Sequence, residues 1–191
     1  MYKFFLFVNN KNMEKSNTKQ KWLLEKYVSY FFIYGFIGWF IELIIMLFDT
    51  HEIVNRGFLT LPILPIYGFG AVVISMIFKE DDYQWVFIAI VGGLIATAIE
   101  LISSFLFKDI LSIELWDYSG LKYNFQGRIS LITSVGFMIA SVILIKVTNP
   151  IIEKKLRRFK YNFMFEIILS SLCILTFVDF IKSIIDSLKM L

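Results

Sequence analysis

The sequence predicts an all-α fold: a polytopic membrane helical bundle of about five transmembrane helices, with a proline-broken second segment. Two observations lead to this fold class. Hydrophobic residues make up 58% of the 191 residues, and the mean hydropathy is +0.70, whereas soluble domains contain about 45–50% apolar residues. The charged residues cluster between long apolar runs, which is the pattern of membrane spans joined by solvated connections.

Five apolar segments account for the predicted bundle. Their approximate ranges are 27–48, 58–78, 85–107, 129–147 and 163–181. Most of them approach the ~20 helical residues that cross a ~30 Å hydrocarbon core. We therefore predict a single transmembrane helical domain over residues 27–188. The polar, lysine-rich residues 1–26 are expected to form a solvated cytoplasmic tail without regular structure, and the apolar run at 4–8 is too short for a cleavable signal, whose core has roughly 7–15 residues.

The second segment is broken near its start. Its uninterrupted part, residues 66–78, would form only about 20 Å of helix, which is too short to cross the membrane. Pro62 and Pro65 disfavour regular helix before it. Broken backbone at membrane depth is tolerated only where protein or a watery cavity satisfies its polar groups. We therefore expect residues 58–65 to lie against protein or to line such a cavity.

Four charged residues are the candidates for an intramembrane site: Glu42, Arg56, Glu100 and Arg128. Glu42 and Glu100 each follow the start of their segment by 15 residues, so both are expected about 22 Å into the membrane, in its outer half. A carboxylate there costs on the order of 2.5–3.5 kcal/mol and should face the bundle interior. Arg56 and Arg128 begin the second and fourth segments on the same side. Either the four residues form a ligand site, or Glu42–Arg56 and Glu100–Arg128 are ion pairs that hold the helices together.

Two further features belong to the outer side of the predicted bundle. Asp179 is a third carboxylate at similar depth, and Lys182, three residues later, is its expected partner on the same helix face. The connection at residues 108–128 is rich in aromatic and turn-forming residues. It is expected to form either a cap over the bundle or a simple aromatic belt.

Four blocks follow one another over about residues 31–131: FFIYGFIGWFIELI, VNRGFLTLPILPIYGFGAVVI, ATAIELISSFLF and LWDYSGLKYNFQGRISL. In order and spacing they resemble the CmpB family, described as type IV ABC-transporter membrane proteins. Thr60 and Leu61 depart from the family pattern, in which a glycine is expected near Pro62. Beside the four charges, the resemblance highlights Gly38, Trp39, Asn55, Gly57, Pro62, Pro65, Tyr67, Gly68, Trp116, Asp117, Tyr118, Ser119, Asn124 and Gly127.

The resemblance implies an ABC-transporter-like permease or transport-associated component with a charged site in the outer half of the bundle. The alternative is a non-transport sensor or binding module for a lipid head group or a small anion. The chain has no G-x-x-x-x-G-K-[ST] run, so an ATPase would be a separate subunit. The other expected partners are membrane lipid and a second copy of the chain, but no nucleic acid.

No catalytic motif is present, and an enzyme acting on lipid would lack an evident nucleophile. No cofactor is expected. The single histidine, His51, and the single cysteine, Cys173, predict neither a metal site nor an intrachain disulfide.

The distribution of positive charge predicts the topology. Thirteen of the nineteen Lys and Arg residues fall in the N-terminal tail, at Lys79, or in residues 146–162. Positively charged connections stay in the cytoplasm, so we expect a multi-pass protein of the plasma membrane with its N-terminus inside and its C-terminus outside. Reporter fusions after Lys160 and after Leu191 should lie on opposite sides; the same side for both would contradict the five-span topology.

Overall fold

The computed structural model describes residues 2–51, 57–79, 82–160 and 162–189. Helix accounts for 78% of the structure, and the described residues contain only one small sheet, of two strands. The predicted all-α class is therefore confirmed.

The elements follow one another along the chain with short connections. They are α1 (Tyr2–Thr50), α2 (Pro65–Ile77), α3 (Trp85–Ser104), the π-helix η1 (Phe105–Ile110), β1 (Asn124–Phe125), β2 (Ile129–Ser130), α4 (Leu131–Ile143), the π-helix η2 (Leu144–Thr148), α5 (Asn149–Leu156), the 3₁₀ turn η3 (Arg157–Phe159) and α6 (Phe163–Lys189).

Four helical stretches of the described chain are long and apolar enough to cross a membrane. They are Asn17–Phe48, Trp85–Ile110, Leu131–Phe159 and Phe163–Lys189, and α2 is a shorter apolar helix. This agrees with four long segments and one broken one. Two local expectations were wrong. The tail before residue 27 continues α1 as helix, although its polar part is rich in Asn, which is a poor helix former. Most of the connection at 146–162 is helical through Phe159, because its Lys, Glu and Arg residues are good helix formers that extend a neighbouring span at little cost.

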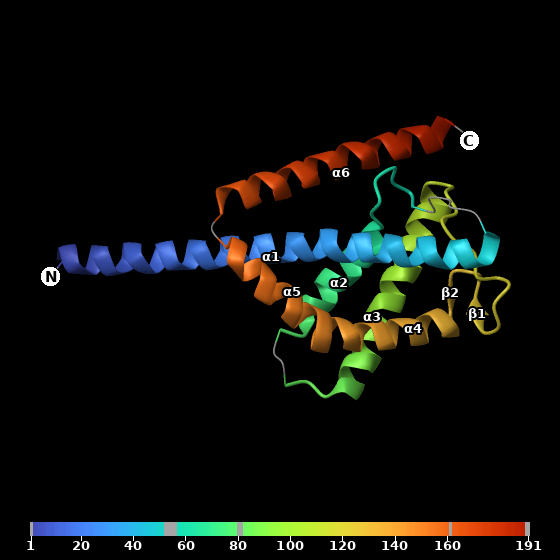
Figure 1. The fold of residues 1–191 in the computed structure, drawn as a ribbon, viewed down its shortest axis with the longest axis horizontal. Coiled ribbons are helices and arrows are strands. Elements are labelled where there is room, and N and C mark those ends of the chain that lie inside the picture. The colour runs from blue at the N-terminus through green and yellow to red at the C-terminus, as the bar shows by residue number, and fades with distance from the viewer. Residues whose placement is uncertain (1, 52–56, 80–81, 161, 190–191) are drawn as a thin grey trace.

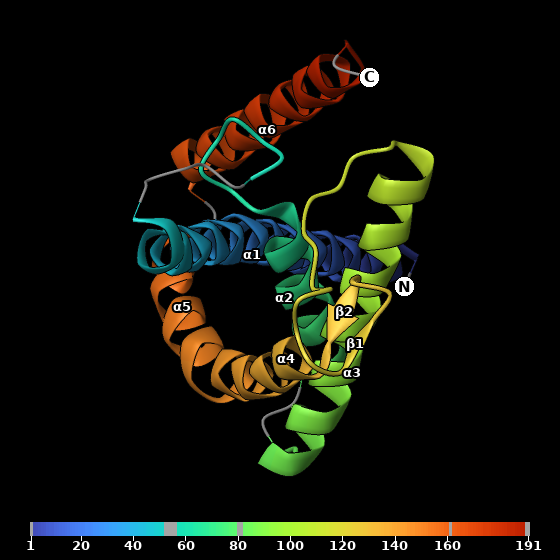
Figure 2. The ribbon, with the colours of Figure 1, turned by 90° about the vertical axis from the view of Figure 1, so that its right-hand side faces the viewer.

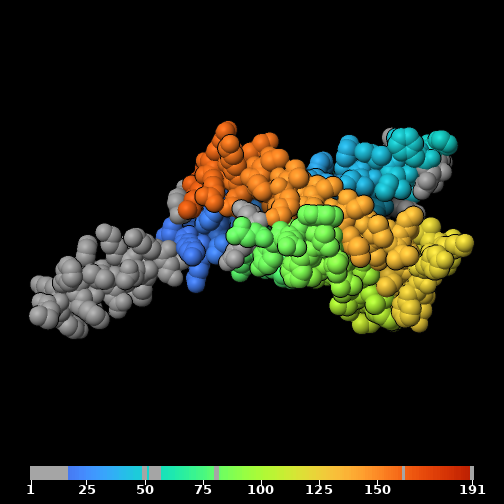
Figure 3. Space-filling view, turned by 90° about the horizontal axis from the view of Figure 1, so that it is seen from below, coloured from blue at the N-terminus to red at the C-terminus, as the bar shows by residue number. Residues whose placement is uncertain are grey.

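The long helix α1 runs through the centre of the molecule (Figure 1). The bent rod of α4, η2 and α5 lies on one side of it and α6 on the other, and α3 crosses α1 and α4 at a steep angle (Figure 2). Seen from below, α3 and the α4–α5 rod pack together (Figure 3). The bend coincides with η2 and with Pro150 at the start of α5, since π-turns and prolines are the usual causes of helix bending.

Two helix pairs approach closely at positions where a glycine leaves no room for a Cβ atom. Within the α1–α2 pair, a Cβ at Gly68 would lie 2.5 Å from the carbonyl oxygen of Phe31. Within the α3–α4 pair, a Cβ at Gly92 would lie 2.5 Å from Cβ of Ser141, and Thr97 donates a hydrogen bond to Ser134 (3.0 Å). Small residues of this kind let helix backbones approach in membrane bundles.

The predicted break before α2 is confirmed. Residues 57–64 have no regular structure, and Pro65 occupies the first turn of α2, where a missing N–H costs nothing. The amide of Leu64 donates to the carbonyl of Gly35 on α1 (3.0 Å), and the amide of Leu61 donates to Oδ2 of Asp179 on α6 (2.9 Å). Asp179, which was expected to pair with Lys182, therefore binds the broken backbone instead. Protein groups thus satisfy these two amides, in agreement with the expectation that residues 58–65 lie against protein.

The contact at Gly68 generates the first structural test. Gly68→Ala places a methyl group against the backbone of α1, and we expect a loss of about 1–3 kcal/mol in the free energy of unfolding from overpacking. Gly70→Ala, two residues later in α2, meets no atom within 4 Å and should gain up to about 1 kcal/mol from helix propensity. Thermal unfolding in detergent measures both. Equal shifts for the two variants would show that the α1–α2 approach is not tight at Gly68.

Candidate functional site

Glu42 on α1 receives a hydrogen bond from the first turn of α2. Gly38 lies one turn before it on the same face of α1. Because Gly38 has no side chain, the ring of Tyr67 rests on α1: a Cβ at position 38 would lie only 2.3 Å from Cγ of Tyr67. The Tyr67 hydroxyl then donates to Oε1 of Glu42 at 2.6 Å. The break before α2 thus determines where this tyrosine hydroxyl points.

Glu100 on α3 receives a matching hydrogen bond from the connection between η1 and β1 (residues 111–123). Its side chain is only 3% exposed, and the Tyr118 hydroxyl donates to its Oε1 at 2.8 Å. The second carboxylate oxygen, Oε2, is buried and has no hydrogen-bond partner among the described residues. Both predicted carboxylates are therefore bound by tyrosines.

The connection that carries Tyr118 is held by its own hydrogen bonds. Asp117 accepts from the amide and the hydroxyl of Ser119, both at 2.8 Å, and the backbone bond first, then the hydroxyl bond, lowers the pKa of the exposed Asp117 carboxyl. The amide of Tyr118 donates to the carbonyl of Gly127 (2.8 Å), and the amide of Gly127 donates to Oδ1 of Asn124 (2.9 Å). These bonds fix the direction of the Tyr118 side chain.

Three residues of this connection have left-handed backbone conformations. Tyr123, Gln126 and Gly127 have positive φ angles of 57°, 54° and 69°, and they flank and close the two-residue strands β1 and β2. A Cβ at position 127 would lie 2.5 Å from Oδ1 of Asp117, so this position combines the φ and the lack of side chain that favour glycine. Trp116 donates from its indole nitrogen to the carbonyl of Arg128 (2.9 Å). The connection is thus an ordered loop, and both the cap and the aromatic belt stay predictions.

Arg128 is paired with Asp109, not with Glu100. Its Nη2 lies 2.7 Å from Oδ1 of Asp109, its Nη1 donates to Ser104 at 3.3 Å, and its guanidinium lies 4.2 Å from the centre of the Phe105 ring. The predicted Glu100–Arg128 ion pair is therefore wrong. The loop returns the arginine to the C-terminal end of α3, where the more exposed Asp109 binds it at a smaller desolvation cost than the buried Glu100 would pay.

Two tyrosine–carboxylate pairs result, Tyr67–Glu42 at 2.6 Å and Tyr118–Glu100 at 2.8 Å. The charge of Glu42 acts on Glu100. We call Glu42, Tyr67, Glu100 and Tyr118 the carboxylate–tyrosine cluster. Its members come from α1, α2, α3 and the connection between η1 and β1.

The other residues predicted for the site do not belong to this cluster. Pro62 and Gly57 lie in the irregular segment, and Trp39 stacks on Phe36 of the same helix with ring centres 5.9 Å apart. Asn55 and Arg56 lie outside the described residues, so the Glu42–Arg56 pair stays a prediction. Asp109 and Asp179 were not predicted as partners, because no sequence spacing relates them to Arg128 or to the amide of Leu61.

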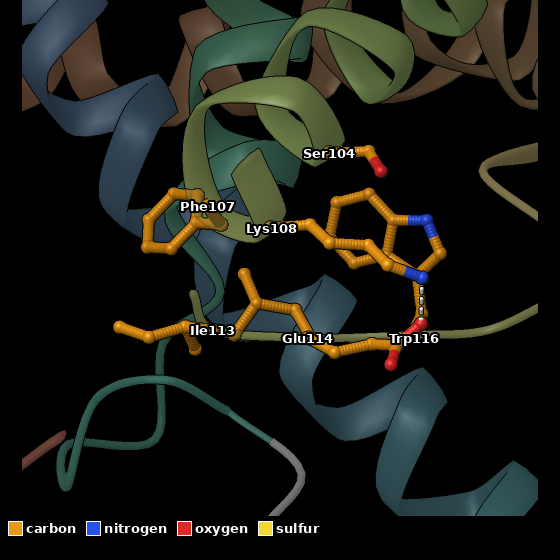
Figure 4. Close-up of a pocket in the computed structure, with 7 residues that line it drawn as sticks. Ser104, Phe107, Lys108, Ile113, Glu114 and Trp116 are labelled. Atoms are coloured by element: carbon orange, nitrogen blue, oxygen red, sulfur yellow. Dashed lines mark hydrogen bonds and ion pairs between the residues drawn. The ribbon is translucent and has the colours of Figure 1, made fainter. Parts of the chain in front are cut away.

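A shallow pocket lies beside this region, at the C-terminal end of α3 (Figure 4). Its lining residues are Ser104, Phe107, Lys108, Ile113, Glu114, Leu115 and Trp116. Lys108 and Glu114 form an ion pair across it. Since both charges are already paired, the pocket offers no free charged group to a ligand and is separate from the carboxylate–tyrosine cluster.

The family model described as "Putative ABC-transporter type IV" matches residues 29–184. The chain belongs to this ABC-transporter CmpB family. The match extends well beyond the blocks at residues 31–131 and includes α4, α5 and most of α6. No curated protein and no solved structure matches the chain.

The Tyr118 hydrogen bond generates a test of the site. Tyr118→Phe keeps the ring but leaves the buried Glu100 without its donor, so we expect a loss of about 1–3 kcal/mol in the free energy of unfolding. Tyr123→Phe, in the same connection, is the matched control: Tyr123 is 75% exposed, so this change should affect stability little. Thermal unfolding in detergent compares them. An unchanged midpoint for Tyr118→Phe would show that the loop does not hold Glu100.

Proposed function

We propose that this chain is the permease component of an ABC-type transporter and that the carboxylate–tyrosine cluster is its intramembrane site. The observation that carries the proposal is the burial of Glu100 in an apolar bundle, where a carboxylate is expensive and usually functional. Family membership supplies the transport context. Discontinuous helices at membrane depth, such as the start of α2, are a recurring feature of transporter sites.

The proposed transporter takes its energy from a separate ATPase subunit, since the chain carries no ATP-binding motif. We place α5 and η3 on the cytoplasmic face of the plasma membrane, together with the N-terminal part of α1. Lys154, Lys155 and Arg158 are exposed there. The helix α5 is more rigid than the loop expected from the sequence, which favours docking of a partner. Its positive side chains are complementary to an acidic partner surface.

The alternative, a sensor for a small anion or lipid head group, has less support from the described residues. An anion site needs an available cation, but Arg128 is bound by Asp109 and the cluster itself is acidic. The cluster therefore favours a positively charged occupant over an anion.

The proposal is tested by purifying the full chain from its native membrane in mild detergent and measuring ATP hydrolysis. We expect an ATPase subunit to accompany the chain. The double charge reversal Lys154→Glu/Lys155→Glu should reduce the associated ATPase activity at least tenfold at equal yield of the chain. That loss corresponds to about 1.4 kcal/mol of binding free energy.

The matched control is Lys189→Glu, which reverses an exposed charge at the far end of α6 and should leave the associated activity unchanged. The permease proposal fails if no ATP-hydrolysing subunit accompanies the wild-type chain. Equal activity in all three preparations would mean that α5 does not dock the ATPase.

A further inference from the structure

We propose that Glu42 and Glu100 together bind one proton, so that the carboxylate–tyrosine cluster is a proton site inside the bundle. This inference deepens the proposed function, because it identifies the ligand of the same site. A hydronium ion in the water on the outer side gives up its proton to one carboxylate oxygen. One O–H bond of the hydronium ion breaks, the O–H bond of the carboxyl group forms, and a water molecule is left. No electron is transferred.

The first argument is the uneven hydrogen bonding of Glu100. One oxygen accepts from Tyr118, while the other is buried without a partner in the described part of the chain. An ionised carboxylate in this environment has lost most of its hydration and gained a single neutral donor. A proton on Oε2 removes the net charge and leaves Oε1 able to accept the tyrosine bond.

The second argument is the neighbouring carboxylate. The charge of Glu42 acts on Glu100, and a nearby negative charge disfavours ionisation of a poorly solvated carboxyl group. A proton on Glu100 removes this repulsion. Glu42 meanwhile keeps the hydrogen bond that it accepts from the Tyr67 hydroxyl.

The third argument comes from the charged groups on the surrounding elements. Tyr67 on α2 and Tyr118 in the connection between η1 and β1 donate neutral hydrogen bonds. Arg128, before α4, is bound by Asp109. On α6, Asp179 accepts from the broken backbone, and Lys182 is exposed. Among the described residues, no cation is paired with either carboxylate of the cluster.

The fourth argument is the small space available to a ligand at this site. Glu100 is 3% exposed, and the pocket beside α3 does not include any residue of the cluster. In the described chain, no group of three or more His, Cys, Asp and Glu side chains is arranged for a metal ion. A proton needs neither a cavity nor a set of ligands, so it is the occupant that this site fits.

Infrared spectroscopy of the purified full chain tests the inference directly, through the C=O stretching band of a protonated carboxyl group. At neutral pH, the difference spectrum between wild type and Glu100→Gln should contain this band, with its usual shift in D₂O. Glu42→Gln should keep the band but lose it at a lower pH than wild type, because the neighbouring negative charge is gone.

Two controls keep the result specific. Glu114→Gln, in the exposed pair with Lys108, should leave the band unchanged. Glu25 is a second buried carboxyl group with unpartnered oxygens in the described chain, and its contribution cancels in the difference spectrum because it is present in both samples. If Glu100→Gln does not fold, Tyr118→Phe replaces it: the band should move to higher frequency when the hydrogen bond is lost.

The absence of any difference band between wild type and Glu100→Gln at neutral pH would overturn the inference, because Glu100 would then be ionised. The measurement needs neither ATP nor a partner subunit. A band without an associated ATPase therefore contradicts only the permease proposal, and an ATPase without a band contradicts only the proton site.

Discussion

The interruption of regular helix before α2, at residues 57–64, is the constraint on which the rest of this structure depends. Helix hydrogen bonds stop at residues 57–64, inside an apolar bundle where water is scarce. The freed amides are bound by two other helices: Leu64 by the carbonyl of Gly35 on α1, and Leu61 by Asp179 on α6. The first bond requires α2 to approach α1 closely, which explains why glycines lie at positions 35, 38 and 68 on the facing surfaces.

The same approach creates the site. Once α2 starts at Pro65 against α1, Tyr67 has to lie over Gly38, and its hydroxyl reaches Glu42 one turn further along α1. Glu100 likewise accepts a hydrogen bond from the hydroxyl of Tyr118, in the connection between α3 and α4. Both donors are neutral hydroxyl groups. They stabilise carboxylates without cancelling the negative charge, unlike the arginines that the sequence suggested as partners.

Features that depend on residues close together in the sequence could be predicted from the sequence. Hydrophobic length located the long helices, prolines located the break, and counting along two helices placed Glu42 and Glu100 in one region. The partner of Arg128 could not be predicted, because it depends on a loop whose left-handed residues include Tyr123 and Gln126, which carry side chains and give no glycine signal. Helix propensity in polar sequence was also underestimated in the N-terminal tail and in residues 146–159.

The cluster lies where two packed units of the bundle meet. One unit is α1 with α2, joined through glycine contacts, and it contains the Tyr67–Glu42 bond. The other is α3 with α4 and the connection between them, and it contains the Tyr118–Glu100 bond. Each hydrogen bond is therefore internal to one unit, while the charge of Glu42 acts on Glu100 across the boundary. The proposed proton removes one of these two negative charges, and its loss would restore their repulsion without breaking either tyrosine bond.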